Sequence, residues 1–412
     1  MEPSKKIMII GAGAGQVPLI VEAKKRGLET LVVSPDGPYP GIALADKQIK
    51  EDIYSKDKLV EIAKAEKIDF VLSDQSDFAV PTVAYIAEHL GLKGNSVTTA
   101  EIFTNKHRQR EFCKENGLKV PAFCLIKSLT DAEIVSFPLP WIVKPTDSQG
   151  SRGISVITNR AQLPAAYADA LRYSKKGEVI VEEYFQGSEV VCEGCVIEGK
   201  YYNFAFADRT YFNLEGKFIP ASTVFPSNIP CGVKNDILRQ EACIAKLANA
   251  SFGIVHSEYL YNEQGDFRLV ETALRGGGVY ISSHLIPLTI GIDPTNLLLD
   301  YLVSGTEKVM EVLDKKKEHG SAGYFCFYLE NGLVDKVEGI DLVKSNPNVV
   351  MAEVDEVKAG YRYPGLEHKG FRKGPFLVKG NSRTDVEKIY RWITDNYKVF
   401  QNHNNYNSVI WK

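Results

Sequence analysis

The chain of 412 residues is long enough for roughly two to four domains, each with a core of its own. Its composition, 44% hydrophobic and 25% charged, is that of an ordinary globular protein and excludes the disordered and collagen-like classes. The 49 basic and 52 acidic residues nearly cancel and form no basic cluster, so no nucleic-acid partner is expected.

The first segment alternates short strands with helices. Strands are predicted at 6–10, 30–34 and 69–73, and helices at 17–26, 56–66 and 78–90. This alternation predicts a parallel sheet covered on both faces, in a Rossmann-like domain over residues 1–96. A turn cluster at 94–96 marks its end.

The remainder of the chain mixes hairpins with helices. A strand at 141–144 precedes a glycine-rich loop, and 178–184 is a further strand. Residues 189–206 predict a hairpin, and 236–252 a helix whose apolar stripe includes Ala242 and Phe252. Residues 311–412 predict a small α+β lobe with a helix at 384–397 and a frayed polar tail at 401–407.

The seven cysteines are dispersed, which is typical of reduced thiols in a cytoplasmic protein. Cys192 and Cys195 have the spacing of a zinc knuckle, but they lie in a strand-like run. An offset of three residues sends their side chains to opposite faces, so buried thiols are predicted. No run of 18 apolar residues occurs, and a strand follows the first few residues, so neither a membrane span nor a secretory signal is expected.

A pair of glutamates flanks a predicted hairpin between residues 253 and 272. With a loop over 263–266, Tyr261 faces Arg268 and Glu258 faces Glu271. Directly opposed residues lie about 5 Å apart at Cβ on one face, where like charges destabilise the sheet unless a cation bridges them. Two carboxylates favour a hard cation such as Mg²⁺, although a solvated acidic face is the simpler interpretation.

Two glycine-rich segments are candidates for binding phosphate. Gly11-Ala-Gly-Ala-Gly15 follows the first strand but has Gln16 where a dinucleotide fingerprint needs glycine. Residues 144–153 link two predicted strands, and their backbone amides can curl over anionic oxygens while Lys144 adds a fixed charge. The alternative is a surface turn. The strand at 179–184 and the acid Glu189 can hold adenine and ribose, or form an ordinary strand and charged turn.

In this order the segments resemble the ATP-grasp superfamily, most closely the branch of biotin carboxylase, carbamoyl phosphate synthetase and the L-amino-acid ligases. The resemblance covers nearly the whole chain. It implies a fold of the α/β and α+β classes with a Rossmann-like domain over 1–96, an ATP-grasp domain over 97–310 and a C-terminal α+β lobe over 311–412. Within the ATP-grasp domain, a lid subdomain is expected at about 120–185.

The resemblance also assigns roles to individual residues. Lys106 and Lys144 match the phosphate-binding lysines, and Glu189 matches the acid that binds ribose. The ATP-binding positions that it implies are Lys106, Lys144, Gly150, Ser151, Gly153, Glu182, Glu183, Tyr184 and Glu189. Glu258 and Glu271 match paired ligands of Mg²⁺, for which Mn²⁺ is a substitute, and Arg275 matches the catalytic arginine of a Glu-x-Asn-x-Arg motif.

One position departs from that motif, because Ala273 stands where the family has a metal-binding asparagine. The hairpin places Ala273 opposite His256, so water is left to supply the missing ligand and the number of metal ions is in doubt. On the substrate side, Arg209, His256 and Ser283 are candidate contacts. An exposed arginine and a satisfied core histidine are the plain alternatives for the first two.

The resemblance implies an ATP-dependent carboxylate–amine or carboxylate–thiol ligase. Such an enzyme activates a carboxylate as an acyl phosphate, and the expected partners are small carboxylate and amine substrates. A non-catalytic ATP-binding module of the same fold is the alternative, with Ala273 as the sign of a decayed metal site. An NAD-dependent oxidoreductase rests only on Gly11 to Gly15. The oligomeric state stays open, with a homodimer common among related enzymes.

Overall fold

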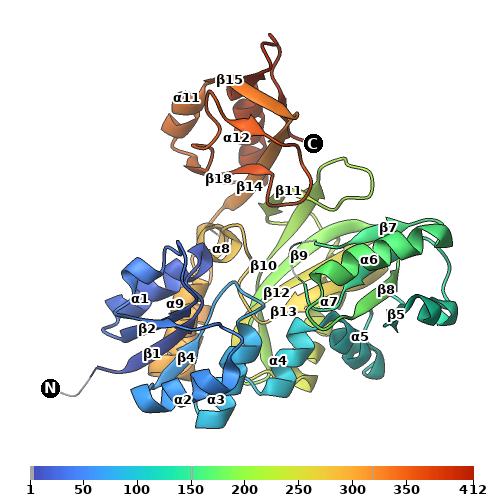
Figure 1. Cartoon of the computed structure of the whole chain (residues 1–412). Helices are drawn as coiled ribbons and strands as arrows, with labels where there is room; N and C mark the ends of the chain where they lie inside the picture. Colours follow the sequence, from blue (N-terminus) through green and yellow to red (C-terminus); the bar gives the residue numbers. More distant parts are fainter. Residues whose placement is uncertain (1–3, 149, 151, 318) are drawn as a thin grey trace.

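The computed structural model describes residues 4–148, 150, 152–317 and 319–412. Figure 1 shows the N-terminal part in blue beside the green and yellow central part, with the C-terminal lobe above both. In the described residues, no helix is both long and apolar enough to cross a membrane.

The first sheet has four parallel strands in the order β3-β2-β1-β4. Its elements are β1 (Lys6–Ile10), α1 (Val17–Lys25), β2 (Glu29–Ser34), β3 (Lys47–Lys50), α2 (Lys56–Glu66), β4 (Phe70–Leu72) and α3 (Val80–Leu90). Alternate residues of β1 enter different cores: Ile7 and Ile9 pack with α1, whereas Met8 and Ile10 pack with α2. The predicted parallel sheet, covered on both faces, is confirmed. The pattern does not predict β3, because only Ile49 of this polar edge strand is buried.

A helix from far along the chain completes this layer. In Figure 1, α9 (Pro294–Ser304) lies beside α1, and the end of α1 is tied to it by an ion pair between Arg26 Nη2 and Asp300 Oδ1 at 2.9 Å. Leu297 of α9 shares a core with Leu19 of α1. Two shorter helices, α8 (Ile286–Ile290) and α10 (Thr306–Asp314), flank α9 in sequence.

The residues predicted to form the lid, about 120–185, make a four-stranded antiparallel sheet of their own, in the order β5-β8-β6-β7. Its elements are β5 (Phe123–Ile126), β6 (Trp141–Pro145), β7 (Ser155–Ile157), α6 (Leu163–Tyr173) and β8 (Val179–Glu183). Beyond α6, the ammonium of Lys175 lies 3.4 Å from the ring centroid of Tyr54 and 5.4 Å from that of Phe78. The lid therefore touches the N-terminal domain through a cation–π contact.

The central sheet is antiparallel and follows the order β13-β12-β9-β10-β11-β14-β18-β16. The strands of its first part are β9 (Ser188–Ile197), β10 (Lys200–Tyr211), β11 (Pro220–Phe225), β12 (Phe252–Tyr261) and β13 (Phe267–Ala273). The helices of this part of the chain are α4 (Val97–Thr104), α5 (Lys106–Glu115) and α7 (Cys231–Leu247). Cys192 and Cys195 of β9 are free, buried thiols in different cores. Their side chains thus lie on opposite faces, as predicted.

The C-terminal residues extend this sheet and also form a small second sheet. The elements are β14 (Ser321–Leu329), β15 (Gly332–Glu338), α11 (Ile340–Ser345), β16 (Val349–Ala352), β17 (Arg362–Tyr363), β18 (Lys373–Gly380), α12 (Arg383–Asn396), β19 (Lys398–Gln401) and β20 (Val409–Ile410). Strand β14 pairs with β11 on one side and with β18 on the other. A three-stranded sheet, β17-β15-β19, stands beside it.

Two predictions about local structure are wrong. The helix predicted at 236–252 runs from Cys231 to Leu247, Ala242 is exposed, and Phe252 begins β12. Proline at 230 favours the earlier start, and the buried stripe includes Val233, Ile237 and Ile244 instead. The tail is exposed at most positions but is not frayed, because Asn407 Oδ1 accepts hydrogen bonds from the amides of both Val399 and Val409.

Candidate active site

The β12–β13 hairpin brings the two glutamates together. Glu258 pairs with Glu271, and His256 pairs with Ala273, as predicted. Nearer the turn the prediction is wrong, since Tyr261 pairs with Phe267 rather than Arg268. The connection is one residue longer than expected, and Asn262 closes it by accepting a hydrogen bond from the Asp266 amide. A bulge at Val270 then restores the register before the glutamates.

Each glutamate has a cationic partner from elsewhere in the chain. Lys106 Nζ, at the start of α5, lies 2.7 Å from Glu271 Oε1. Arg209 of β10 donates a hydrogen bond to Glu258, and His256 Nε2 lies 3.3 Å from Glu258 Oε1. Burial raises the pKa of Glu258, but Arg209 and His256 outweigh it and hold this pKa well below its usual value. Protein cations thus offset the repulsion between the two carboxylates.

Lys144 is fixed by a buried chain of charges. Its ammonium lies 2.7 Å from Glu182 Oε2, and Glu182 Oε1 accepts a hydrogen bond of 2.9 Å from Arg110 Nε. All three side chains are buried. Burial and the nearby cations lower the pKa of Lys144 to about 8, although Glu182 opposes this shift. The Glu182 carboxylate is therefore committed to Lys144 and Arg110.

The next two residues, Glu183 and Tyr184, are held by backbone hydrogen bonds to the residues just before β5 and β6. The Glu183 amide donates to the Ala122 carbonyl at 2.8 Å, and the Tyr184 amide donates to the Pro140 carbonyl at 3.2 Å. The Glu183 carboxylate in turn accepts a hydrogen bond from the Ala122 amide. These bonds fix the path of the chain between the lid and β9.

The glycine-rich loop connects β6 to β7. Gly150 and Gly153 have φ values of +81° and +67°, a left-handed conformation that side chains rarely adopt. A Cβ at Gly153 would lie 2.8 Å from the Tyr173 ring and 3.0 Å from the Ala170 Cα, so α6 also requires glycine there. Ser151 lies outside the described residues. Lys106 Nζ donates to the Ser148 carbonyl at 2.8 Å, which ties this loop to the glutamates.

Glu189 and Arg209 meet at the junction of β9 and β10. Arg209 Nη1 lies 3.0 Å from Glu189 Oε1 and also contacts Glu258, and Tyr211 donates a hydrogen bond to Glu189. The Arg209 and Glu189 side chains are both largely buried, so Arg209 is not the exposed arginine of the simpler interpretation. It joins the predicted ribose-binding acid to the predicted metal ligand.

Arg275 is oriented from the N-terminal domain. Its Nε and Nη2 atoms donate to the two carboxylate oxygens of Asp77 at 2.8 and 3.0 Å. The amide of the next residue, Gly276, donates to Asp74 Oδ1 at 3.0 Å. The loop after β4 therefore fixes both the arginine and the backbone that follows it. Ser283 hydrogen-bonds His284 and, among the described residues, has no hydrogen bond to any acid or base named above.

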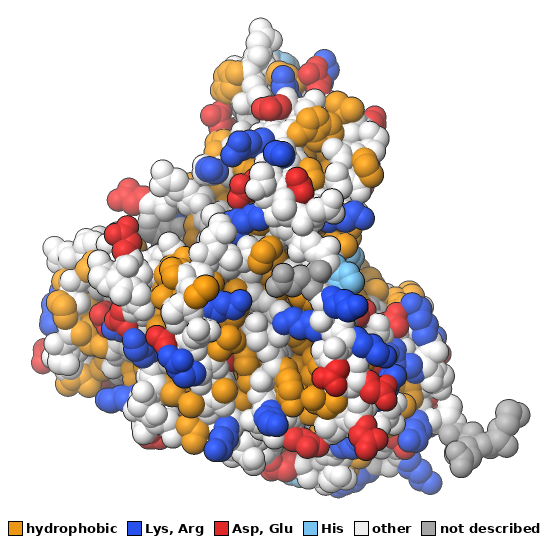
Figure 2. All heavy atoms as spheres, turned by 180° about the vertical axis from the view of Figure 1, so that it is seen from behind, with side chains coloured by type: hydrophobic (Ala, Val, Ile, Leu, Met, Phe, Trp, Pro, Cys, Tyr) orange, Lys and Arg blue, Asp and Glu red, His pale blue; other side chains and the backbone are white. Residues whose placement is uncertain are grey.

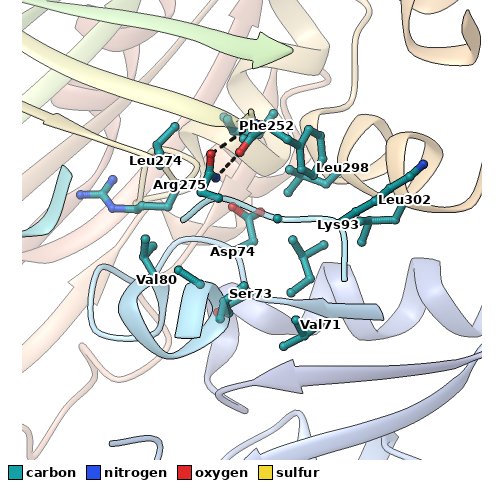
Figure 3. Close-up of a pocket in the computed structure, with 17 residues that line it drawn as sticks. Val71, Ser73, Asp74, Val80, Lys93, Phe252, Leu274, Arg275, Leu298 and Leu302 are labelled. Carbon is teal, nitrogen blue, oxygen red and sulfur yellow. Dashed lines mark hydrogen bonds between the residues drawn. The ribbon is translucent and has the colours of Figure 1, made fainter. Parts of the chain in front are cut away.

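An apolar cavity of about 50 Å³ lies next to Asp74, between the first sheet and β12 (Figure 3). Its labelled lining residues are Val71, Ser73, Asp74, Val80, Lys93, Phe252, Leu274, Arg275, Leu298 and Leu302. In Figure 3 the Arg275 side chain extends away from the others. Pockets for small-molecule ligands usually measure about 300–1,000 Å³, so this cavity is too small to be the substrate pocket.

Arg110, Asp77 and Glu193 are the site residues that sequence reasoning missed. Glu193 contacts His256 Nδ1, and its side chain is fully buried. Each of the three reaches its partner across a long stretch of sequence. The one available signal was the alternation of β9, which puts Glu193 on the same face as Glu189.

The glutamates fit a hard cation bound together with a phosphate-rich ligand. Within the described part of the chain, no group of three or more His, Cys, Asp or Glu residues is arranged to hold a metal ion. Mg²⁺ is commonly bound by one or two carboxylates, with substrate phosphates and water completing its shell. Glu258 and Glu271 supply those carboxylates on one face of the hairpin. Figure 2 shows Lys and Arg side chains across the middle of one face of the molecule, although the overall charge is −3.

Comparison with known proteins identifies the fold. Residues 137–283 match the model of the ATP-grasp domain. Among solved structures, the L-amino acid ligase from Bacillus licheniformis has a TM-score of 0.80 at 21% identity, covering 98% of this chain and 100% of that chain. The predicted fold class is therefore confirmed, and so is the predicted resemblance to ATP-grasp enzymes.

Similarity in sequence extends to curated ligases and transferases. The chain is 26% identical over 387 residues to the alanine–anticapsin ligase of Bacillus subtilis (strain 168), covering 83% of this chain and 79% of that protein. It is 29% identical over 186 residues to a formate-dependent phosphoribosylglycinamide formyltransferase of Prochlorococcus marinus (strain MIT 9515). The chain spans about half the length of that relative, 47%, and the match covers 44% of this chain.

Proposed function

We propose that the protein is an ATP-dependent ligase that joins a carboxylate to an amine. The observation that carries this proposal is the charge pattern at the hairpin. Glu258 and Glu271 oppose each other, Lys106 and Arg209 pair with them, and Arg275 lies just beyond the end of β13. A site of this kind suits a triphosphate, a divalent cation and a second anion held together.

The reaction requires these charges because it brings anionic groups into contact. A carboxylate oxygen of the substrate attacks the γ-phosphorus, the bond to the bridging oxygen of ADP breaks, and an acyl phosphate forms. The amine nitrogen then attacks the acyl carbon, phosphate leaves with the bonding electron pair, and the nitrogen loses a proton. Positioning and charge stabilisation account for most of the catalysis of such a phosphoryl transfer.

The residues divide this work. Lys106 and Lys144 bind phosphate oxygens, and Glu189 binds the ribose. Arg275, held bidentately by Asp77, stabilises the transferred phosphoryl group. Mg²⁺ held by Glu258 and Glu271 would neutralise phosphate charge. The glycine-rich loop excludes water from the acyl phosphate, and the backbone of Glu182 to Tyr184 borders the adenine.

Measurement of ADP and phosphate release with a panel of amino acids tests the proposal. We expect turnover that needs both a carboxylate and an amine, and a loss of at least a hundredfold in Arg275→Lys, because lysine cannot form the bidentate contact. Absence of turnover with every pair, together with calorimetric binding of ATP, would instead support the non-catalytic module.

The oxidoreductase alternative is not supported by the first domain. The Gln16 side chain lies over the glycine turn, where its Oε1 accepts a hydrogen bond of 3.0 Å from the Gly13 amide. Its Nε2 donates to the Asp74 carbonyl at 2.6 Å. The turn is thus filled by the protein itself, as expected if the glycines serve close packing. The domain limits at residues 96 and 310, the homodimer and the cytoplasmic location stay predictions, the last supported by seven free cysteines.

A further inference from the structure

The row of residues beside the paired glutamates has an unusual composition. In the registers of the central sheet, His256 of β12 pairs with Glu193 of β9 on one side and with Ala273 of β13 on the other. Two residues along β12, Glu258 pairs with Glu271. Because side chains alternate along a strand, both rows lie on the same face of the sheet. An acid and an imidazole therefore stand next to the proposed metal ligands.

The imidazole connects two carboxylates. His256 Nδ1 contacts Glu193 Oε1, and His256 Nε2 lies 3.3 Å from Glu258 Oε1. Glu193 has no exposed surface, and the His256 side chain is 7% exposed. Glu193 thereby fixes the ring orientation, and the free nitrogen of the ring is directed at Glu258.

The loop after β13 encloses this pair. A Cβ at Gly277 would lie 2.6 Å from Glu193 Oε1 and 3.0 Å from His256 Nδ1, so glycine is needed for the loop to pass so closely. The second oxygen of Glu193, Oε2, is buried and has no hydrogen-bond partner among the residues that the structure describes. Burying an oxygen without a hydrogen-bond partner destabilises the fold, so a purely structural role would be met better by an apolar residue.

We propose that Glu193 and His256 position Glu258 for metal binding, as a substitute for the ordering that a ligand at position 273 would otherwise provide. This inference rests on the proposed function, since it concerns the same metal site. The two glutamates are held differently: Lys106 lies 2.7 Å from Glu271 Oε1, whereas Glu258 contacts both Arg209 and His256. Groups that orient metal ligands through hydrogen bonds typically contribute about 10- to 100-fold to metal affinity.

The test measures Mn²⁺ binding to the full chain by electron paramagnetic resonance, in the presence of a non-hydrolysable ATP analogue. Glu193→Gln and His256→Asn are each expected to weaken Mn²⁺ binding by about 10- to 100-fold. The double variant should bind Mn²⁺ no more weakly than the single His256→Asn variant, because the two residues act as one unit. Affinity for the analogue without metal should not change.

A matched control is available in α7, which contacts the opposite face of β12 through Tyr259. Glu241 is also buried and accepts a hydrogen bond of 2.5 Å from Tyr259, the residue after Glu258. Glu241→Gln changes a buried carboxyl group whose pKa burial raises to about 7 and whose hydrogen-bond partner is Tyr259, so the Mn²⁺ affinity of this variant should stay at the wild-type value. Circular dichroism of all variants confirms that they are folded.

Several results would overturn the proposal. Unchanged Mn²⁺ affinity in folded Glu193→Gln and His256→Asn variants would show that the pair is only structural. A nitrogen coupling to Mn²⁺ that vanishes in His256→Asn would make the imidazole a ligand rather than a positioning group. If Glu258→Gln and Glu271→Gln also leave Mn²⁺ binding unchanged, the metal site of the proposed function is itself wrong.

Discussion

Replacing Glu182 by glutamine is expected to weaken ATP binding at neutral pH through its effect on Lys144. In the wild type the Lys144 ammonium lies 2.7 Å from Glu182 Oε2, and its pKa is about 8. Two opposite charges whose centres are about 4 Å apart interact by about 4 kcal/mol at an effective dielectric constant of about 20. That energy corresponds to about three pKa units.

The sign of the effect follows from the lysine equilibrium. Lys144 is charged below its pKa and neutral above it, so wild-type affinity for ATP should fall as the pH rises through about 8. Without the Glu182 charge, this pKa drops below neutrality and the lysine is already uncharged at pH 7. We expect Glu182→Gln to bind at least tenfold more weakly at pH 7 and to lack the transition near pH 8.

Calorimetric titration with a non-hydrolysable ATP analogue from pH 6 to 9.5 measures both quantities. Lys144→Arg is the matched control, because a guanidinium keeps its charge and removes the transition without removing the cation. Breaking a buried ion pair costs about 3–5 kcal/mol of stability, so thermal unfolding must show that Glu182→Gln is folded. Wild-type affinity and an unchanged transition in a folded variant would refute this reasoning.

Glu271→Gln is expected to lower turnover by about a hundredfold or more, because it removes a proposed metal ligand and the partner of Lys106. Steady-state ADP release at several Mg²⁺ concentrations measures this loss. An unchanged Mg²⁺ dependence would argue against the assignment of Glu271 as a metal ligand. Cys231 and Cys243 are exposed and should react first with a thiol reagent in the native protein; fast labelling that survives Cys231→Ser with Cys243→Ser would contradict this. Lys175→Ala removes the cation–π contact between the lid and the N-terminal domain, and it should raise the rate of protease cleavage within residues 146–154 several-fold. An unaltered cleavage rate would show that this contact does not hold the lid.

Local patterns made much of the fold predictable. The strand at 6–10 and the helix at 56–66 have the predicted bounds, because their apolar periodicity and flanking breakers are strong. The helix at 231–247 was misplaced because small residues such as Ala242 fit both an exposed and a buried face. The hairpin shows the same limit. Its glutamate pair was predicted correctly although the turn was not, since the bulge at Val270 compensates for a longer connection.

Site residues could be predicted where their residue type and their order along the chain matched a known motif. Lys106, Glu258 and Glu271 are in this group, and the structure brings all three together. The residues that hold Arg275 and Glu182 were not predictable. Asp77 reaches Arg275 from another domain, and Arg110 reaches Glu182 from a helix under the lid, so both contacts exist only after folding.

The continuity of the central sheet limits how the chain can be divided. Strand β11 hydrogen-bonds to β14, which belongs to the last hundred residues. A protein truncated near residue 311 would lack β14, so the edge of β11 would be unpaired and the apolar side chains around it uncovered. Such an exposed edge promotes aggregation. The lid stands on a sheet of its own and forms no strand pairing with the central sheet in the described residues. In chimaeras made with related proteins, the lid should therefore be exchangeable alone, whereas β11 and the C-terminal lobe should be taken from the same parent.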